Sequence, residues 1–279
     1  MPTPLAGLRI LSLAGNVPGP AAVARLVSLG AAAVTVEPPA GDALRVVAPA
    51  WHRALTAGVD LRRLDLKQPA DRTALHVALH ASDLLLVSMR PAALARLGLD
   101  WPSLHASFPR LCLVSIVGHA GAAAALPGHD LTYQAAAGLL SPPALPRTLV
   151  ADLAGAERAV TAALALLLAR ERGLGAGHAE VSLGDAAADL AAPLRHGLTA
   201  PGGPLGGGLP GYGLYPAREG WVAVAALEPH FAACLAAALG VAALTPDSLG
   251  TALMARTAAE WAAWGVERDV PVVEVKGAG

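Results

Sequence analysis

Cysteine is scarce in this sequence of 279 residues, which contains only Cys112 and Cys234. The two cysteines lie far apart and form no CxxC pair, so the sequence favours neither a disulfide framework nor a cysteine-based zinc site. We therefore expect no metal site. Free cysteines in such small number are typical of the reducing cytoplasm, where we expect the protein to be located.

Charge and long hydrophobic runs are also scarce. Charged residues make up 15% of the chain and the formal net charge is -1, so no basic surface favours nucleic acid or an anionic membrane as a partner. The longest apolar run, 159–169, lies between Arg158 and Arg170 and is too short to span a bilayer. The low share of charge instead predicts buried subunit contacts and a homodimer.

What is abundant is a regular alternation of short apolar strands and helices. Residues 8–13 predict a strand, 20–29 a helix that ends at Gly30, and 33–36 a second strand, which together form a βαβ unit. The alternation continues with a helix at 69–80, a strand at 83–88, a helix from Pro91 to Gly98 and a strand at 110–117. This pattern predicts a doubly wound, Rossmann-like α/β fold with a parallel sheet.

The rest of the chain predicts a second, smaller α+β domain joined by a linker rich in Gly and Pro. A long helix is expected at 152–172 and a strand at 179–183, and the linker composition is most marked at 202–213. Beyond it we expect a strand at 221–226, a helix at 231–239 and a short helix that begins with a capping box at Thr257 and ends at Gly265. The expected division is a large domain at 1–195, a linker at 196–215 and a small domain at 216–279.

Two motifs near the start of the chain carry little functional information. The turn 15–20 follows the first strand but lacks the GxGxxG spacing, and Pro18 and Pro20 remove two amide donors. A plain turn is favoured there over a ligand site, although the helix start could face a ligand. His76 and His80 share a helix face without a third ligand, which indicates a solvated surface rather than a metal site.

Four acidic or imidazole groups lie where an open α/β sheet binds ligands or where a helix begins. His129 and Asp130 follow the strand that ends at Val117, and loops at the carboxyl ends of strands hold the ligands of such folds. Asp152 lies at the start of the long helix, where an N-cap lies, and Glu228 precedes the helix at 231–239. Each of the three acids has a structural alternative as a helix cap.

Taken in order along the chain, several short motifs resemble one known family. They are VEPPAGD at 36–42, LDLK at 64–67, the pair Arg90-Pro91, GHD at 128–130 with Tyr133, Ala151-Asp152, and LEP at 227–229. Together they resemble the class III CoA-transferases, and most closely their α-methylacyl-CoA racemase branch.

The resemblance implies specific catalytic roles. Asp152 matches the aspartate that forms the acyl-enzyme anhydride in transferases and serves as one acid/base group in racemases. His129 matches the histidine that marks the racemase branch, as the second acid/base group. Glu228 matches the carboxylate that orients this histidine.

The resemblance also implies that coenzyme A enters as part of an acyl-CoA thioester substrate and that no cofactor is tightly bound. Arg90, Asp130 and Tyr133 match positions that line the CoA site. The basic run that the family usually carries is replaced here by residues 56–59. Arg62, Arg63 or Arg45 could substitute for it, and we name Arg62 as the candidate. Compared with the family, the small domain is expected to be shortened at its C-terminal end.

These features give a first interpretation and two alternatives. The first is a cofactor-independent 2-methylacyl-CoA racemase or epimerase, in which two groups transfer the α-proton through a thioester enolate. The second is a class III CoA-transferase that uses Asp152 as the nucleophile. The third is a CoA-binding relative without turnover, which the absent basic run suggests.

The expected homodimer gives a direct prediction. Light scattering at micromolar concentration should report about twice the chain mass of 27.9 kDa. A single species at the chain mass would contradict the prediction.

Overall fold

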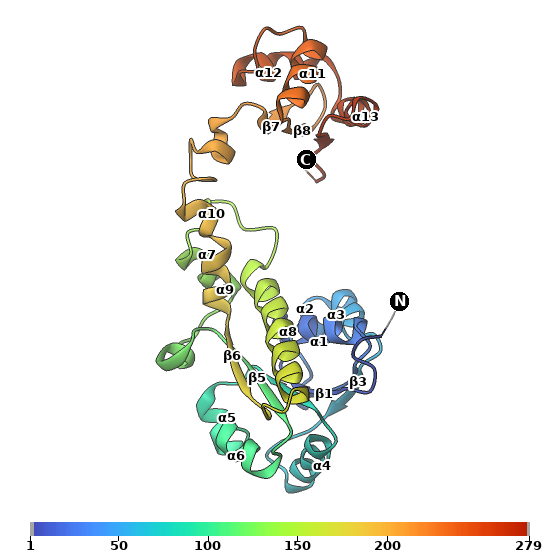
Figure 1. The fold of residues 1–279 in the computed structure, drawn as a ribbon, viewed down its shortest axis with the longest axis vertical. Coiled ribbons are helices and arrows are strands. Elements are labelled where there is room, and N and C mark those ends of the chain that lie inside the picture. Colours follow the sequence, from blue (N-terminus) through green and yellow to red (C-terminus); the bar gives the residue numbers. More distant parts are fainter. Residues whose placement is uncertain (1–2, 278–279) are drawn as a thin grey trace. The chain divides into compact units, whose positions relative to one another are not determined.

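The computed structural model describes residues 3–277, and the chain divides into two compact units, 1–191 and 192–279 (Figure 1). Each unit has a sheet of its own. The larger contains a parallel sheet between helices and the smaller an antiparallel sheet with helices, which confirms the predicted fold class. Strand β7 begins at Tyr212, within the range expected to be linker.

The larger unit is built on six parallel strands in the order β3-β2-β1-β4-β5-β6. They are β1 (Arg9–Leu13), β2 (Ala32–Glu37), β3 (Asp60–Arg63), β4 (Leu84–Val87), β5 (Cys112–Val117) and β6 (His178–Ser182). The chain builds outward from β1 through β2 to β3, then returns to the other side of β1 with β4. The winding direction therefore reverses between β1 and β4, which is where open sheets of this kind form a crevice.

Helices cover both faces of this sheet (Figure 1). They are α1 (Pro18–Ser28), α2 (Leu44–Val47), α3 (Pro49–Leu55), α4 (Pro69–His80), α5 (Pro91–Leu97), α6 (Trp101–Ser107), α7 (Asp130–Ala136), α8 (Val150–Glu171) and α9 (Leu183–Leu190), with a 3₁₀ turn η1 (Gly121–Ala125). One buried cluster joins α1, α8 and α9 to the sheet, and a second joins α4, α5 and α6 to its other face. No helix within residues 3–277 has the length and apolar character needed to cross a bilayer.

Burial explains which strands the sequence pattern reveals. All residues of β4 and β5 are buried, as expected for central parallel strands covered on both faces. In contrast, β3 has the sequence DLRR and is exposed at every position. It forms the edge of the sheet and has no apolar pattern, which is why the sequence analysis did not predict it.

The smaller unit has a three-stranded antiparallel sheet in the order β7-β8-β9. Its elements are α10 (Ala192–Arg195), η2 (Pro204–Gly208), β7 (Tyr212–Pro216), β8 (Trp221–Ala225), α11 (Pro229–Leu239), α12 (Pro246–Ala252), η3 (Leu253–Ala255), α13 (Ala258–Arg268) and β9 (Val272–Glu274). Its core contains Trp261, which is 2% exposed and whose indole N–H donates to the carbonyl of Leu253 at 2.7 Å.

Several predicted helix boundaries differ from the structure by a few residues; α1 and α11, for example, begin at Pro18 and Pro229, two residues before their predicted starts. The capping box at Thr257 is present, but α13 continues past Gly265 to Arg268 and ends at Asp269, which has φ 53°. A Cβ on Gly265 would lie 2.7 Å from the carbonyl oxygen of Val272, so this glycine allows β9 to approach the helix rather than ending it. The long helix α8 likewise begins at Val150, two residues before the predicted start.

The tightest approach at the start of α1 yields a stability prediction. A Cβ on Gly19 would lie 2.2 Å from the carbonyl oxygen of Ala14. Because that oxygen belongs to the backbone, Gly19→Ala should lower the free energy of unfolding by about 1–3 kcal/mol in chemical denaturation followed by circular dichroism.

The matched control for this variant is Gly250→Ala. Gly250 lies inside α12 with no atom within 4 Å of the added Cβ. It should gain about 0.5–1 kcal/mol from the higher helix propensity of alanine. Equal effects of the two substitutions would contradict this account.

Candidate active site

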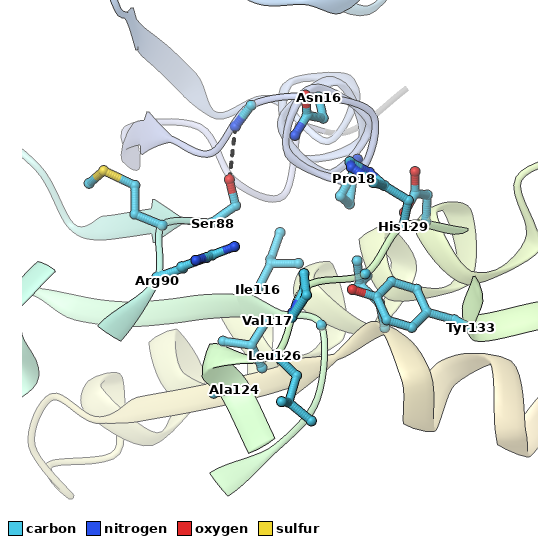
Figure 2. Close-up of a pocket in the computed structure, with 17 residues that line it drawn as sticks. Asn16, Pro18, Ser88, Arg90, Ile116, Val117, Ala124, Leu126, His129 and Tyr133 are labelled. Carbon is cyan, nitrogen blue, oxygen red and sulfur yellow. Dashed lines mark hydrogen bonds between the residues drawn. The ribbon is translucent and has the colours of Figure 1, made fainter. Parts of the chain in front are cut away.

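A cavity of about 310 Å³ lies in the larger unit at the carboxyl ends of β1, β4 and β5. Its wall includes Asn16 after β1, Ser88 and Arg90 after β4, and Gly118 after β5 (Figure 2). It therefore occupies the reversal point between β1 and β4, where this type of sheet binds ligands. His129 and Asp152, from two different loops and helices, also line it.

The turn between β1 and α1 is held by two side chains from other parts of the chain. The Gly15 amide donates to Oγ of Ser88 at 3.0 Å (Figure 2), and the Asn16 amide donates to Oδ2 of Asp42 at 2.9 Å. These bonds hold Asn16 at φ 61°, in the left-handed region. Both amides are thus already bonded, and the turn presents the side chain of Asn16 to the cavity.

Helix α7 positions His129 and Tyr133 on the cavity wall. His129 is the N-cap residue, and Oγ1 of Thr132 accepts its amide hydrogen at 3.1 Å and donates to its carbonyl oxygen at 2.8 Å. This local pair fixes the backbone of His129 while its side chain stays exposed. Tyr133, one turn later, is 4% exposed and lines the same cavity.

Asp152 occupies the first turn of α8, as its third residue rather than its N-cap. Its own amide donates to Oδ1 of Asp130 at 3.0 Å. Oδ2 of Asp130 accepts a hydrogen bond of 2.5 Å from Nε2 of Gln134, which also donates to the carbonyl of Thr148 at 3.2 Å. The buried carboxylate of Asp130 therefore joins the starts of α7 and α8.

The electrostatics of the cavity centre on Asp152. Its pKa rises from an ordinary 3.8 to about 6, chiefly because the carboxyl group is removed from water and secondly because Asp130 lies nearby, while His129 opposes the shift. Burial also raises the pKa of Tyr133, and the charge of Asp152 adds to that effect. Asp152 can thus exchange a proton close to neutral pH, and Tyr133 keeps its hydroxyl hydrogen.

The structure places the predicted site residues in three groups. His129, Asp152, Arg90 and Tyr133 line the cavity. Asp130 lies directly behind it, bonded to α8. Arg62 and Glu228 are not among the residues that line this cavity.

Arg62 lies on edge strand β3, where its Nη2 pairs with Oδ2 of Asp60 at 2.7 Å, and it lines a separate hollow. Glu228 lies in the smaller unit as the N-cap residue of α11, exposed and without the side-chain hydrogen bond of a cap. The side chain of Glu228 therefore does not cap α11, although the sequence allowed that structural role.

Sequence analysis missed a second cavity, of about 740 Å³, beside the first. Lys67 and Arg96 line it, and Met89 lines both cavities. Lys67 ends the LDLK motif and Arg96 begins the RLGL motif at 96–99, which also carries the family resemblance, so both gave a signal to which no role was assigned. Within residues 3–277 no group of three or more His, Cys, Asp or Glu side chains could hold a metal ion.

The family model for CoA-transferase family III matches residues 5–279. The chain belongs to CoA-transferase family III. This confirms the resemblance found in the sequence motifs.

Known relatives of this family III chain include both reaction types. It is 34% identical over 139 residues to the cinnamoyl-CoA:phenyllactate CoA-transferase of Clostridium sporogenes, covering 45% of this chain and 34% of the relative. It is 31% identical over 257 residues to the human alpha-methylacyl-CoA racemase, covering 85% and 65%. The chain thus spans about a third of the first relative's length and slightly under two thirds of the second's.

A solved structure supports the fold of this family III chain. The crystal structure of the hypothetical protein Rv3272 from Mycobacterium tuberculosis superposes with a TM-score of 0.80 at 26% identity, covering 98% of this chain and 83% of that one. The fold therefore agrees with that of a solved protein over nearly the whole chain.

The raised pKa of Asp152 predicts a stability gain when its charge is removed. A group whose pKa is higher in the folded state is destabilising above that pKa, and the penalty disappears below its unfolded pKa. Asp152→Asn should therefore be more stable than the wild type at pH 8, by about 1–2 kcal/mol after allowance for partial solvent contact.

The pH dependence of this stability difference is the control. The difference between Asp152→Asn and the wild type should shrink as the pH falls through about 6 and vanish below 3.8. Urea unfolding across this range measures it. A difference that is constant with pH would show that the carboxyl group is not held in a desolvated site.

Proposed function

We propose that the chain is a 2-methylacyl-CoA racemase or epimerase that transfers the α-proton between two groups, His129 and Asp152. The observation that supports this most is that both side chains line one cavity and come from the starts of two different helices, α7 and α8. Inverting a carbon centre requires an acid and a base on its opposite faces. Two proton carriers from separate elements can provide them.

The chemistry follows from the acidity of a proton next to a thioester. One group removes this proton, the electron pair of the C–H bond forms a C=C bond, and the carbonyl oxygen takes up the negative charge as an enolate. The other group then donates a proton to the opposite face. A carboxyl group with a pKa near 6 exchanges protons close to neutral pH, which suits a reversible reaction.

Coenzyme A is proposed as the carrier of the acyl group, with no tightly bound cofactor. The cavity lined by Lys67 and Arg96 adjoins the active-site cavity through Met89. Its two cations suit the phosphates of an extended CoA. Arg90, on the wall of the active-site cavity, supplies a third positive charge nearby. Arg62, which the sequence suggested for this role, is instead paired with Asp60 and lines a different hollow.

A CoA-transferase is the second candidate, because the transferase from Clostridium sporogenes is one of the chain's relatives. In that reaction the Asp152 carboxylate would attack the thioester carbonyl, release CoA thiolate and form a mixed anhydride. It requires no proton carrier at His129.

We propose Glu228 as the group that orients His129 in the racemase. We also propose that the protein is cytoplasmic and forms a homodimer.

Isotope exchange separates these reactions. In D₂O the wild type should load deuterium at the α-carbon of a 2-methylacyl-CoA, as measured by mass spectrometry. His129→Ala and Asp152→Ala should each reduce the exchange by roughly 10²–10⁴, the usual effect of a positioned acid or base. Glu228→Gln should have a smaller effect, with a moved pH optimum, because the imidazole would lose an anionic partner.

The matched control for the histidine variant is His80→Ala, an exposed histidine on α4 that contacts Phe108. It should leave exchange unchanged. If Asp152→Ala abolishes transfer of CoA between acids while His129→Ala has little effect, the transferase is the correct reaction. If the wild type shows neither exchange nor transfer, the chain is a CoA-binding relative without turnover.

A further inference from the structure

The side chain of Tyr133 is largely buried, and its hydroxyl group opens onto the cavity. Tyr133 is 4% exposed and lines the active-site cavity. Within residues 3–277 its hydroxyl makes no hydrogen bond. Figure 2 shows the hydroxyl oxygen directed toward Val117 and Leu126. With no protein partner, this hydroxyl group can donate a hydrogen bond to a ligand in the cavity.

Two glycines make room for this side chain. A Cβ on Gly118 would lie 2.3 Å from the hydroxyl oxygen, and a Cβ on Gly128 would lie 2.5 Å from the ring. The ring of His119 packs edge-on against the tyrosine, with centroids 5.2 Å apart. The phenol is therefore held in one place by the absence of side chains at two positions and by one aromatic contact.

Three of the neighbouring backbone donors are already committed. The amides of Gly15 and Asn16 donate to Ser88 and Asp42, and the amide of Asp152 donates to Asp130. Asn16 and Arg90 offer side-chain donors, but both are exposed. Among the described residues that line this wall, Tyr133 has a largely buried side chain, and its hydroxyl makes no hydrogen bond to the protein. Because a hydrogen bond is stronger in a desolvated site, it is the best placed to meet a developing charge.

We propose that Tyr133 is a catalytic residue whose hydroxyl donates a hydrogen bond to the carbonyl oxygen of the acyl-CoA thioester. As the α-proton leaves for His129 or Asp152, the C–H electron pair forms the C=C bond and the carbonyl π pair moves onto this oxygen. The hydroxyl hydrogen stays on Tyr133 throughout and stabilises the enolate. When the other group returns a proton to the carbon, the carbonyl re-forms. The role rests on the proposed function.

The protonation of the phenol is consistent with this role. Burial raises its pKa, and the negative charge of Asp152 raises it further. The group therefore remains a hydrogen-bond donor across the neutral range, which an oxyanion requires.

Tyr133→Phe tests the proposal, because it removes the hydroxyl and keeps the ring between Gly118 and Gly128. The kcat for deuterium exchange should fall by roughly 10²–10³, as expected when one oxyanion donor is lost. KM should rise only by the roughly 2- to 10-fold expected from one lost neutral hydrogen bond, and the thermal unfolding midpoint should stay close to that of the wild type. A variant that keeps its kcat would overturn the proposal.

A binding measurement tests the same contact independently of turnover. Calorimetry should compare a 2-methylacyl-CoA thioester with the S-alkyl-CoA thioether, which has the same chain but no carbonyl oxygen. Tyr133→Phe should weaken binding of the thioester by roughly 2- to 10-fold and leave the thioether unaffected, because one neutral hydrogen bond is lost. Equal losses for both ligands, or none, would contradict a contact with the carbonyl.

The two measurements separate this proposal from the proposed function. If the wild type shows no exchange but prefers the thioester only when the hydroxyl is present, the racemase assignment fails and only the hydrogen bond from Tyr133 to the thioester carbonyl stands. If exchange is normal in the wild type and in Tyr133→Phe, the racemase assignment stands and the proposed role of Tyr133 fails. Tyr212→Phe, at an exposed tyrosine of β7, is the matched control and should change neither measurement.

Discussion

The site depends on a single buried carboxylate, that of Asp130. It is 4% exposed and holds the amide of Asp152 with one oxygen and the side chain of Gln134 with the other. This bond fixes the start of α8 relative to the start of α7, and so sets the separation of Asp152 from His129. The same negative charge contributes to the raised pKa of Asp152. Geometry and protonation of the candidate acid/base pair therefore share one structural cause.

The parallel sheet explains why the other polar groups gather at the same place. In a parallel sheet all strands end at one edge, and the reversal between β1 and β4 leaves an opening there that no crossover helix covers. Residues that follow three strands in sequence, Asn16, Ser88 and Gly118, are thereby brought to one cavity. Ser88 on the cavity wall and Asp42 from the loop after β2 accept hydrogen bonds from the amides of the first turn and so fix its backbone.

Local sequence patterns predict much of the fold. The parts that they do not predict were missed for physical reasons. Helix α4 runs from Pro69 to His80 as predicted, because proline at its first position and an apolar stripe define it. Gly265 was misjudged because a glycine that ends a helix and one that admits a neighbouring strand look the same in sequence. At the site, motifs identified His129 and Asp152, but the bond between Asp130 and Asp152 joins loops 22 positions apart, which no local pattern reveals.

The protonation of Asp152 bears on which reaction the site suits. With a pKa of about 6, roughly a tenth of Asp152 carries a proton at pH 7, whereas an aspartate at 3.8 would carry one in fewer than about one molecule in a thousand. A racemase uses this carboxyl group as an acid for one enantiomer and as a base for the other, so both forms must be populated. A transferase needs only the ionised form, and for it a raised pKa brings no benefit. Burial beside Asp130 therefore lowers the stability of the folded protein. It also enlarges the protonated population of Asp152, which proton transfer in both directions requires.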